Sequence, residues 1–289
     1  MPATHVIIST HTTRHLRATL LGVAIQQPRP ETVIVSIDND HPEIRSLCHA
    51  AAREFELPIL ITWRPFPGEV RVGQVRNNGV RALLGTRHSA LSTDSWLHFL
   101  DGDSVCPPNM LATAAKLREN HDLLIGGRIL LTEQQTAAFD EAALRAHRDP
   151  VAITQPQLDE LAHRHARYQR QQFLKHFGLS KPHKPKVLGA NHACTLAIYQ
   201  HVSGYDETFL GAWREDDDFG RRAHLAKARS VVAVKTAYVY HLWHPLNPQK
   251  RENWSELPAT TGDNAHLPRA GLTSPLPQEA PTTELIQPN

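Results

Sequence analysis

The N-terminal third of the chain alternates short runs of β-branched residues with segments whose apolar residues recur at helical spacing. A short β-branched run predicts a strand, and apolar residues at helical spacing predict a helix that packs on a sheet. Because parallel strands need a crossover connection, this alternation predicts an α/β fold with a mostly parallel central sheet and flanking helices. The predicted strands are His5–Ser9, Thr32–Ile37, Ile59–Trp63 and Trp96–Leu100, and the predicted helices are 16–25, 43–55 and 72–84.

Polar clusters directly follow three of these strands. They are Ser9-Thr10-His11, Asp38-Asn39-Asp40 and Asp101-Gly102-Asp103. In open parallel sheets, ligands bind outside the carboxyl ends of the strands. We therefore expect the three clusters to line a binding site along one edge of the sheet.

The triplet Asp101-Gly102-Asp103 is suited to a metal-bound ligand. Residues i and i+2 of a strand point the same way, so both carboxylates are expected to face one point. Gly102 lets the backbone come close to whatever lies there. A carboxylate pair suits a hard divalent cation, which in turn suits a diphosphate. The alternative is a polar strand end with a solvated turn.

Two further clusters lie in the C-terminal half. The first is Glu215-Asp216-Asp217-Asp218, preceded by Trp213. Acids in the first turn of a helix account for one or two of the four carboxylates. A general base with neighbours that hold a hydroxylated acceptor accounts better for all of them. The second cluster is His241 and His244 after a predicted strand at 230–240, where one imidazole would complete a metal shell begun by Asp103.

The rest of the chain is less regular. The predicted strands are 122–131, 187–199 and 230–240, and the predicted helices are 107–120 and 219–228. Segment 136–186 is charged and rich in His and Gln, which predicts a solvated helical insertion; the alternatives are a mobile wall over the site or a surface for an acidic acceptor. The tail, 255–289, has no apolar period and is predicted to be disordered.

Composition excludes several classes. A formal charge of +2 argues against a nucleic acid partner. Three widely spaced cysteines argue against a disulfide framework and fit a reducing compartment. No apolar run has the length of a membrane span and no secretory signal is present, so a cytoplasmic protein is expected, with peripheral contact at the inner membrane left open. Nothing in the sequence indicates the oligomeric state.

Taken together, residues 4–250 resemble a GT-A-type glycosyltransferase of family 2, with a galactosyltransferase-like C-terminal module. The matching motifs are Arg76-Asn77, Asp101-Gly102-Asp103, Gly189-Ala190-Asn191, Gly204-Tyr205-Asp206-Glu207-x-Phe209, Gly211-x-Trp213-x-Glu215-Asp216-Asp217-Asp218 and Tyr240-His241. The resemblance implies a Rossmann-like GT-A fold. It also implies a single catalytic domain at 1–254, with a nucleotide-binding half at 1–120 and an acceptor half at 121–254.

The resemblance also implies an inverting transfer of a sugar from a UDP-sugar to a saccharide or glycolipid acceptor. The implied metal is Mn²⁺ (or Mg²⁺), held by Asp103 and His241, with His244 as the alternative to His241, and the implied base is Asp216. The implied nucleotide-binding residues are Ser9, Thr10, His11, Asp38 or Asp40, Arg76, Asp101 and Gly102, and the implied sugar or acceptor contacts are Asn191, Trp213, Glu215 and Asp217.

The sequence departs from the family in places. The first strand ends Ser9-Thr10-His11-Thr12 where the family has Pro-x-Tyr-Asn, and Asp38-Asn39-Asp40-His41 replaces Asp-Asp-Gly-Ser. Trp213 also lies one residue nearer to the acids than in the galactosyltransferase pattern.

Three other functions are alternatives to this one. A sugar nucleotidyltransferase should carry a glycine-rich loop after its first strand, and Ile8–Arg14 has no glycine. A metal-dependent hydrolase built on His241-x-x-His244 lacks the glutamate of H-E-x-x-H, and Pro245 stops a helix there. A non-catalytic nucleotide-sugar-binding protein is the third alternative.

Overall fold

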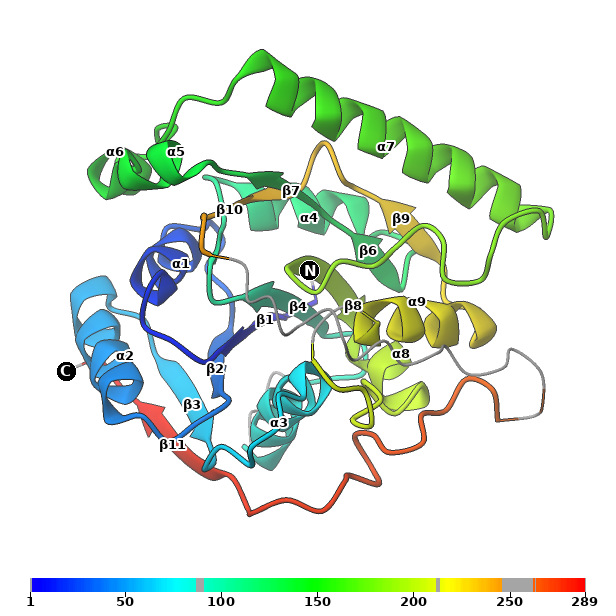
Figure 1. Cartoon of the computed structure of the whole chain (residues 1–289), viewed down its shortest axis with the longest axis horizontal. Coiled ribbons are helices and arrows are strands. Elements are labelled where there is room, and N and C mark those ends of the chain that lie inside the picture. Colours follow the sequence, from blue (N-terminus) through cyan, green and yellow to red (C-terminus); the bar gives the residue numbers. More distant parts are fainter. Residues whose placement is uncertain (1, 87–90, 212–213, 246–261, 263, 289) are drawn as a thin grey trace.

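The computed structural model describes residues 2–86, 91–211, 214–245, 262 and 264–288. Among these residues, eight strands form a central sheet in the order β11-β3-β2-β1-β4-β8-β6-β9 (Figure 1). The strands are β1 Thr4–Thr10, β2 Thr32–Ile37, β3 Ile59–Trp63, β4 Trp96–Asp101, β6 Leu123–Ile125, β8 Asn191–Thr195, β9 Ser230–Val232 and β11 Thr282–Ile286. The four strands predicted in the N-terminal third are all present within a residue or two of their expected bounds.

The central sheet is mostly parallel, as predicted. β3, β2, β1 and β4 pair in parallel, β8 is antiparallel to both β4 and β6, and β11 is antiparallel to β3. From β1 the chain passes to β2 and β3 on one side and then returns to β4 on the other. The strand order therefore reverses between β1 and β4, and a ligand crevice is expected outside the carboxyl ends of these two strands.

Helices cover both faces of the sheet (Figure 1). α1 and α2 lie on one face, and α3, α8 and α9 lie on the other. The strands of the N-terminal half are consequently buried on both faces, which explains their nearly continuous apolar sequence. The helices are α1 Leu16–Ala24, α2 Pro42–Phe55, α3 Val72–Gly85, α4 Met110–Leu117, α5 Glu133–Ala137, α6 Glu141–Arg145, α7 Gln155–His176, α8 Leu196–His201 and α9 Glu215–Leu225.

A second, three-stranded sheet has the order β5-β10-β7. Its strands are β5 Ser104–Val105, β7 Gly127–Leu130 and β10 Tyr238–His241. The predicted strands 122–131 and 230–240 are therefore each divided between the two sheets. The division at 126–127 needs glycine, because a Cβ on Gly127 would lie 2.0 Å from the Val234 carbonyl oxygen. Periodicity alone does not reveal such a crossing, since both halves are apolar.

Two other elements differ from the sequence prediction. The predicted strand 187–199 is strand β8 followed directly by helix α8, whose first turn is capped by the Thr195 hydroxyl. The predicted helix 219–228 begins earlier, at Glu215, so all four acids lie in the first turn of α9. Carboxylates are stabilised there by the helix dipole, which explains how the helix extends through them. The insertion is helical, as predicted, and α7 is its main element.

The tail differs most from the prediction. The described part of it, 264–288, packs along α3 and ends in β11, which pairs with β3 from Ile59 to Trp63. The prediction of disorder is thus wrong for these residues. An uncovered edge strand exposes unpaired backbone groups, and the short run Thr282–Ile286 covers the edge of β3. The C-terminal segment is ordered because β11 pairs with β3, and amino-acid composition cannot predict this long-range pairing.

Among the described residues, no helix is long and apolar enough to cross a membrane.

Candidate active site

The carboxyl ends of β1 and β4 are joined at the point where the strand order reverses. The Ser9 hydroxyl donates to Asp101 Oδ1 over 3.3 Å, and the Gly102 N–H donates to the Ser9 carbonyl over 2.9 Å. A Cβ on Gly102 would lie 2.6 Å from the Thr10 hydroxyl oxygen. Gly102 is therefore needed for the close packing of the triplet on β1.

Arg76 lies at the centre of this edge. Its guanidinium donates to Asp101 over 3.0 Å, to Glu215 over 3.1 Å and to Asp216 over 2.8 Å, and its side chain is only 3% exposed. A Cβ on Gly189 would lie 2.0 Å from one guanidinium nitrogen, so glycine is required there. Arg76 contacts three carboxylates and links β4 to α9, and its predicted contact with the nucleoside stays a prediction.

Two carboxylates of this group remain accessible: the Asp101 side chain is 32% exposed and the Asp216 side chain is 21% exposed. Asp216 Oδ2 accepts from the Gly189 N–H over 2.9 Å, and the Tyr205 hydroxyl lies 3.3 Å from Asp216 Oδ1. Burial, followed by the nearby charge of Glu215, raises the pKa of Asp216 to about 7, against the opposing effect of Arg76. A carboxylate with a pKa near neutrality is suited to accept a proton at physiological pH.

The other three acids of α9 have different environments. Glu215 is 2% exposed and contacts Arg76. Asp217 accepts from Lys186 Nζ over 2.8 Å. Asp218 is fully buried and pairs with two arginines of its own helix. Glu215 and Asp217 are both buried, at 2% and 5% exposed, and their predicted contacts with an acceptor stay predictions.

A second group of side chains brings together Asp103, His241 and His244. Asp103 Oδ1 lies 3.6 Å from His241 Nε2, and Asp103 Oδ2 lies 3.2 Å from His244 Nε2. One ligand atom from each residue lies within 4.8 Å of the others. The pairing of β5 with β10 explains this proximity, because His241 is opposite Ser104 and the Leu242 N–H donates to the Asp103 carbonyl.

This donor set fits a divalent transition metal. It offers carboxylate oxygen and imidazole nitrogen, and all three side chains are partly exposed, at 15–32%. Mn²⁺ accepts such mixed ligands, whereas Mg²⁺ prefers oxygen ligands alone. Although burial opposes ionisation of Asp103, the hydrogen bond from His244 and the charges of the two histidines lower its pKa below the ordinary value.

The two aspartates of the triplet do not face the same group. Asp101 contacts Arg76 and Ser9, whereas Asp103 contacts the two histidines. The expectation that both carboxylates face one point is wrong because β4 ends at Asp101 and the chain turns at Gly102. Strand alternation therefore no longer applies at Asp103.

The predicted nucleoside contacts differ in exposure. Asp38 is buried and accepts from Arg64 over 3.2 Å, and burial raises the pKa of Asp38 to about 6 despite that arginine. Asp40 is exposed. His11 is also exposed, and its carbonyl accepts from the Asn39 amide over 2.9 Å. The sequence analysis did not identify Arg64. Arg64 directly follows β3, whereas Asp38 follows β2, and no local sequence pattern predicts that the two side chains pair.

Asn191 does not reach a ligand site. Its side chain is fully buried, donates to the Gly127 and Ala237 carbonyls over 2.8 and 2.9 Å, and lies 2.9 Å from His98 Nε2. The predicted sugar contact is therefore corrected: Asn191 ties β8 to the crossing between the two sheets. Trp213, predicted to contact the sugar, lies outside the described residues.

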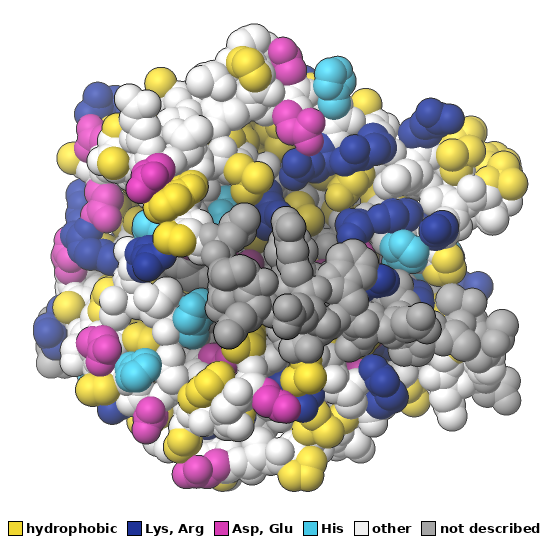
Figure 2. Space-filling model, viewed as in Figure 1, with side chains coloured by type: hydrophobic (Ala, Val, Ile, Leu, Met, Phe, Trp, Pro, Cys, Tyr) yellow, Lys and Arg dark blue, Asp and Glu magenta, His cyan; other side chains and the backbone are white. Residues whose placement is uncertain are grey.

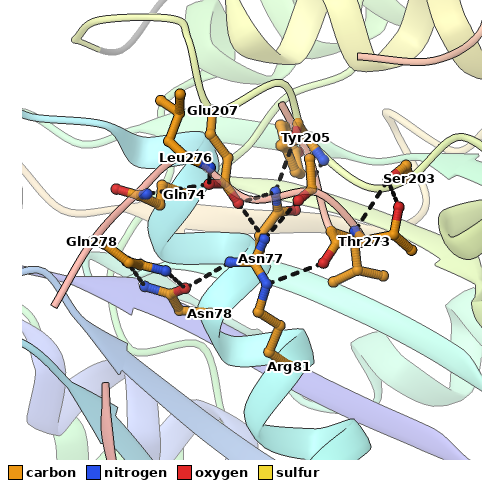
Figure 3. Close-up of polar contacts among 12 residues, drawn as sticks. Gln74, Asn77, Asn78, Arg81, Ser203, Tyr205, Glu207, Thr273, Leu276 and Gln278 are labelled. Atoms are coloured by element: carbon orange, nitrogen blue, oxygen red, sulfur yellow. Dashed lines mark hydrogen bonds and ion pairs between the residues drawn. The ribbon is translucent and has the colours of Figure 1, made fainter. Parts of the chain in front are cut away.

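A buried polar network fixes helix α3, which carries Arg76 (Figure 3). The Asn77 amide donates to the Tyr205 carbonyl over 2.9 Å and to Glu207 over 2.8 Å, and its oxygen accepts from the Tyr205 N–H over 2.9 Å. Glu207 is fully buried and also accepts from Gln74 and from the Leu276 N–H. The network therefore fixes the position of Tyr205 relative to α3, which carries Arg76. The C-terminal segment contributes the Leu276 N–H to it.

We expect Asn77→Leu to lower the free energy of unfolding by about 2–4 kcal/mol, because it leaves buried donors and acceptors without partners. The measurement is urea denaturation followed by circular dichroism. The matched control is Gln134→Leu, an exposed amide on α5, with an expected change within about 0.5 kcal/mol. A loss below about 1 kcal/mol in Asn77→Leu would show that the network does not stabilise α3.

Comparison with known proteins gives a fold but no close relative. The sequence matches no protein-family model and no curated protein. The structure resembles that of S. aureus TarS 1-349, with a TM-score of 0.51 and 18% identity over 82% of this chain and 60% of that chain. For TarS 1-349 in complex with UDP, the TM-score is 0.52 at 18% identity, with 82% and 60% covered.

For TarS 1-349 in complex with UDP-GlcNAc, the TM-score is 0.55 at 16% identity, with 88% of this chain and 62% of that chain covered. This chain thus spans about 60% of the TarS 1-349 chain. At this level of identity the likeness concerns the fold alone. The mostly parallel sheet, its flanking helices and this likeness together show an α/β fold of the GT-A type.

Proposed function

We propose that the protein is a metal-dependent, inverting glycosyltransferase that moves a sugar from a UDP-sugar to a hydroxyl of a saccharide or glycolipid. The observation that carries this proposal is the pair of groups near the carboxyl end of β4: the Asp103–His241–His244 cluster and the accessible Asp216 with its raised pKa. The complexes of TarS with UDP and UDP-GlcNAc support a UDP-sugar as the donor class.

In this proposal Asp103, His241 and His244 hold Mn²⁺. When bound, the ion supplies Lewis-acid neutralisation of the diphosphate leaving group. Asp38 or Asp40, with Ser9, Thr10 and His11, would contact the nucleoside. The buried Asp38–Arg64 pair and the Asn39–His11 bond support an ordered wall there.

Asp216 is the proposed general base. It takes the proton of the acceptor hydroxyl as the hydroxyl oxygen forms a bond to the anomeric carbon. The bond between that carbon and the diphosphate oxygen breaks at the same time, and its electron pair leaves with UDP. One displacement from the opposite face inverts the anomeric configuration. Arg76, Tyr205 and the Gly189 N–H orient the carboxylate for this step.

The test is ¹H NMR of the slow hydrolysis of UDP-GlcNAc by the protein with Mn²⁺, with water in place of the acceptor. Because the sugar is α-linked in the donor, we expect the β-anomer of GlcNAc to appear first and the α-anomer only by later mutarotation. Initial release of the α-anomer would contradict the inverting mechanism. Binding of UDP-GlcNAc without any turnover, with or without saccharides, would favour the non-catalytic alternative.

A further inference from the structure

We propose that the acceptor is a negatively charged saccharide, held by a cationic surface beside Asp216; this inference rests on the proposed function. We define the acceptor-side cationic surface by six residues of β7, α7 and the segment that follows α7. They are Arg128, Arg164, Arg167, Lys181, Lys184 and Lys186. In the space-filling view, Lys and Arg side chains gather beneath α7 and over the segment between α7 and α9 (Figure 2).

The surface begins at the proposed base. Lys186 pairs with Asp217, the residue after Asp216. Three residues beyond Lys186, the Gly189 N–H donates to Asp216 Oδ2. In a single displacement the base lies across the sugar from the diphosphate, so the region around Asp216 is the acceptor side. An acceptor whose hydroxyl reaches Asp216 therefore extends onto this surface.

The cations of this surface lie close together. Burial lowers the pKa of Lys184, and the charges of Lys186, Lys181 and Arg167 lower it further, against the opposing charge of Asp217. Tyr168 lies among Arg164, Arg167, Arg128 and Asp217, and the Arg167 guanidinium carbon is 5.8 Å from the centre of its ring. Like charges gathered in this way repel one another.

Carboxylates offset only part of this charge. Asp217 pairs with Lys186, and Glu160 pairs with Arg164 over 2.9 Å. Within the described part of the chain, Arg128, Arg167, Lys181 and Lys184 form no ion pair with a carboxylate. The chain as a whole carries a formal charge of only +2, so the excess is local. Carboxylate or phosphodiester groups on the units next to the reactive hydroxyl would supply the missing counter-charge.

The experiment is isothermal titration of the protein with tetragalacturonate, which is carboxylated and α-1,4-linked, and with neutral α-1,4-linked tetrasaccharides, galactotetraose and maltotetraose. We expect tetragalacturonate to bind at least about tenfold more tightly and to weaken as salt rises from about 50 mM to about 500 mM. Arg167→Gln/Lys181→Gln should weaken its binding about tenfold, since both side chains are exposed and neither forms an ion pair with a described residue. Lys186 is left intact because it contacts Asp217.

The matched control is Arg53→Gln/Lys116→Gln, which removes one exposed arginine and one exposed lysine from α2 and α4. Equal binding of tetragalacturonate and the neutral tetrasaccharides, or an equal loss in the control, would overturn the proposal. Tighter binding of a single-stranded oligonucleotide or of phosphatidylglycerol vesicles would assign the surface to another partner and also overturn it. These titrations need no nucleotide or metal, so a failure of saccharide binding is distinguished from a failure of UDP binding, which would contradict the proposed function on which this inference rests.

Discussion

Asp103→Ala is expected to abolish Mn²⁺-dependent binding of UDP, with an affinity loss of at least about 100-fold. Asp103 is the one carboxylate of the cluster with His241 and His244, and it contacts both imidazoles. Its removal leaves the cluster without a carboxylate, and imidazoles carry no negative charge to offset a divalent cation. The measurement is calorimetric titration of UDP into the variant in the presence of Mn²⁺.

Parallel titrations of His241→Ala and His244→Ala separate the two candidate imidazole ligands. The His241 side chain is 15% exposed and the His244 side chain is 32% exposed, so His241→Ala removes more buried surface than His244→Ala. The larger loss identifies the ligand that contributes more to the site. Asp122→Ala is the matched control, since it removes a partly exposed carboxylate that pairs with Arg229 away from the cluster. Wild-type UDP affinity in Asp103→Ala would refute the assignment of this cluster.

Asp216→Asn is expected to retain UDP binding and to lose sugar transfer or hydrolysis by about 10²–10⁴-fold. The amide keeps the shape of the carboxylate but cannot accept the proton of the attacking hydroxyl. Asp122→Asn is the control, with an expected change within about fivefold, because Asp122 pairs with Arg229 rather than with Arg76. Near-normal turnover in Asp216→Asn would show that another group is the base.

The pH profile gives a second readout of the same residue. The ionised carboxylate is the active form and its pKa is about 7, so the rate should rise about tenfold per pH unit below neutrality and level off above it. The pH dependence of stability has the opposite sign to that of the rate.

Folding raises the pKa of Asp216, so the folded protein is stabilised by protonation of this carboxyl. The stabilisation is complete below the unfolded pKa of about 4 and is lost as the pH rises through about 7. Asp216→Asn should therefore be no less stable than the wild type at pH 8.

The sequence predicts the fold well where secondary-structure signals are local. The β-branched runs that form β1, β2, β3 and β4 are buried on both faces, and their bounds follow from the residues alone. The crossing from one sheet to the other at Gly127 and the pairing of β11 with β3 depend on residues far apart in the sequence. Periodicity and composition contain no information about such contacts, which explains both errors.

The candidate site shows the same division. The proximity of Asp103 to His241 agrees with the predicted metal shell, although more than a hundred residues separate them. Arg76 and Asn191 carry polar groups that fit ligand binding, but the structure uses these groups internally. Residue type alone does not distinguish a buried structural hydrogen-bonding group from a ligand contact, because both need the same chemistry. The roles of Asp103, Asp216 and the nucleoside residues stay predictions.

The most direct test of the metal–UDP site is titration of the wild-type protein with UDP in three states: with Mn²⁺, after chelation by EDTA, and after Mn²⁺ is restored. We predict binding with Mn²⁺, its loss after chelation and its recovery on restoration. Absence of UDP binding with Mn²⁺, or binding that EDTA leaves unchanged, would contradict the account.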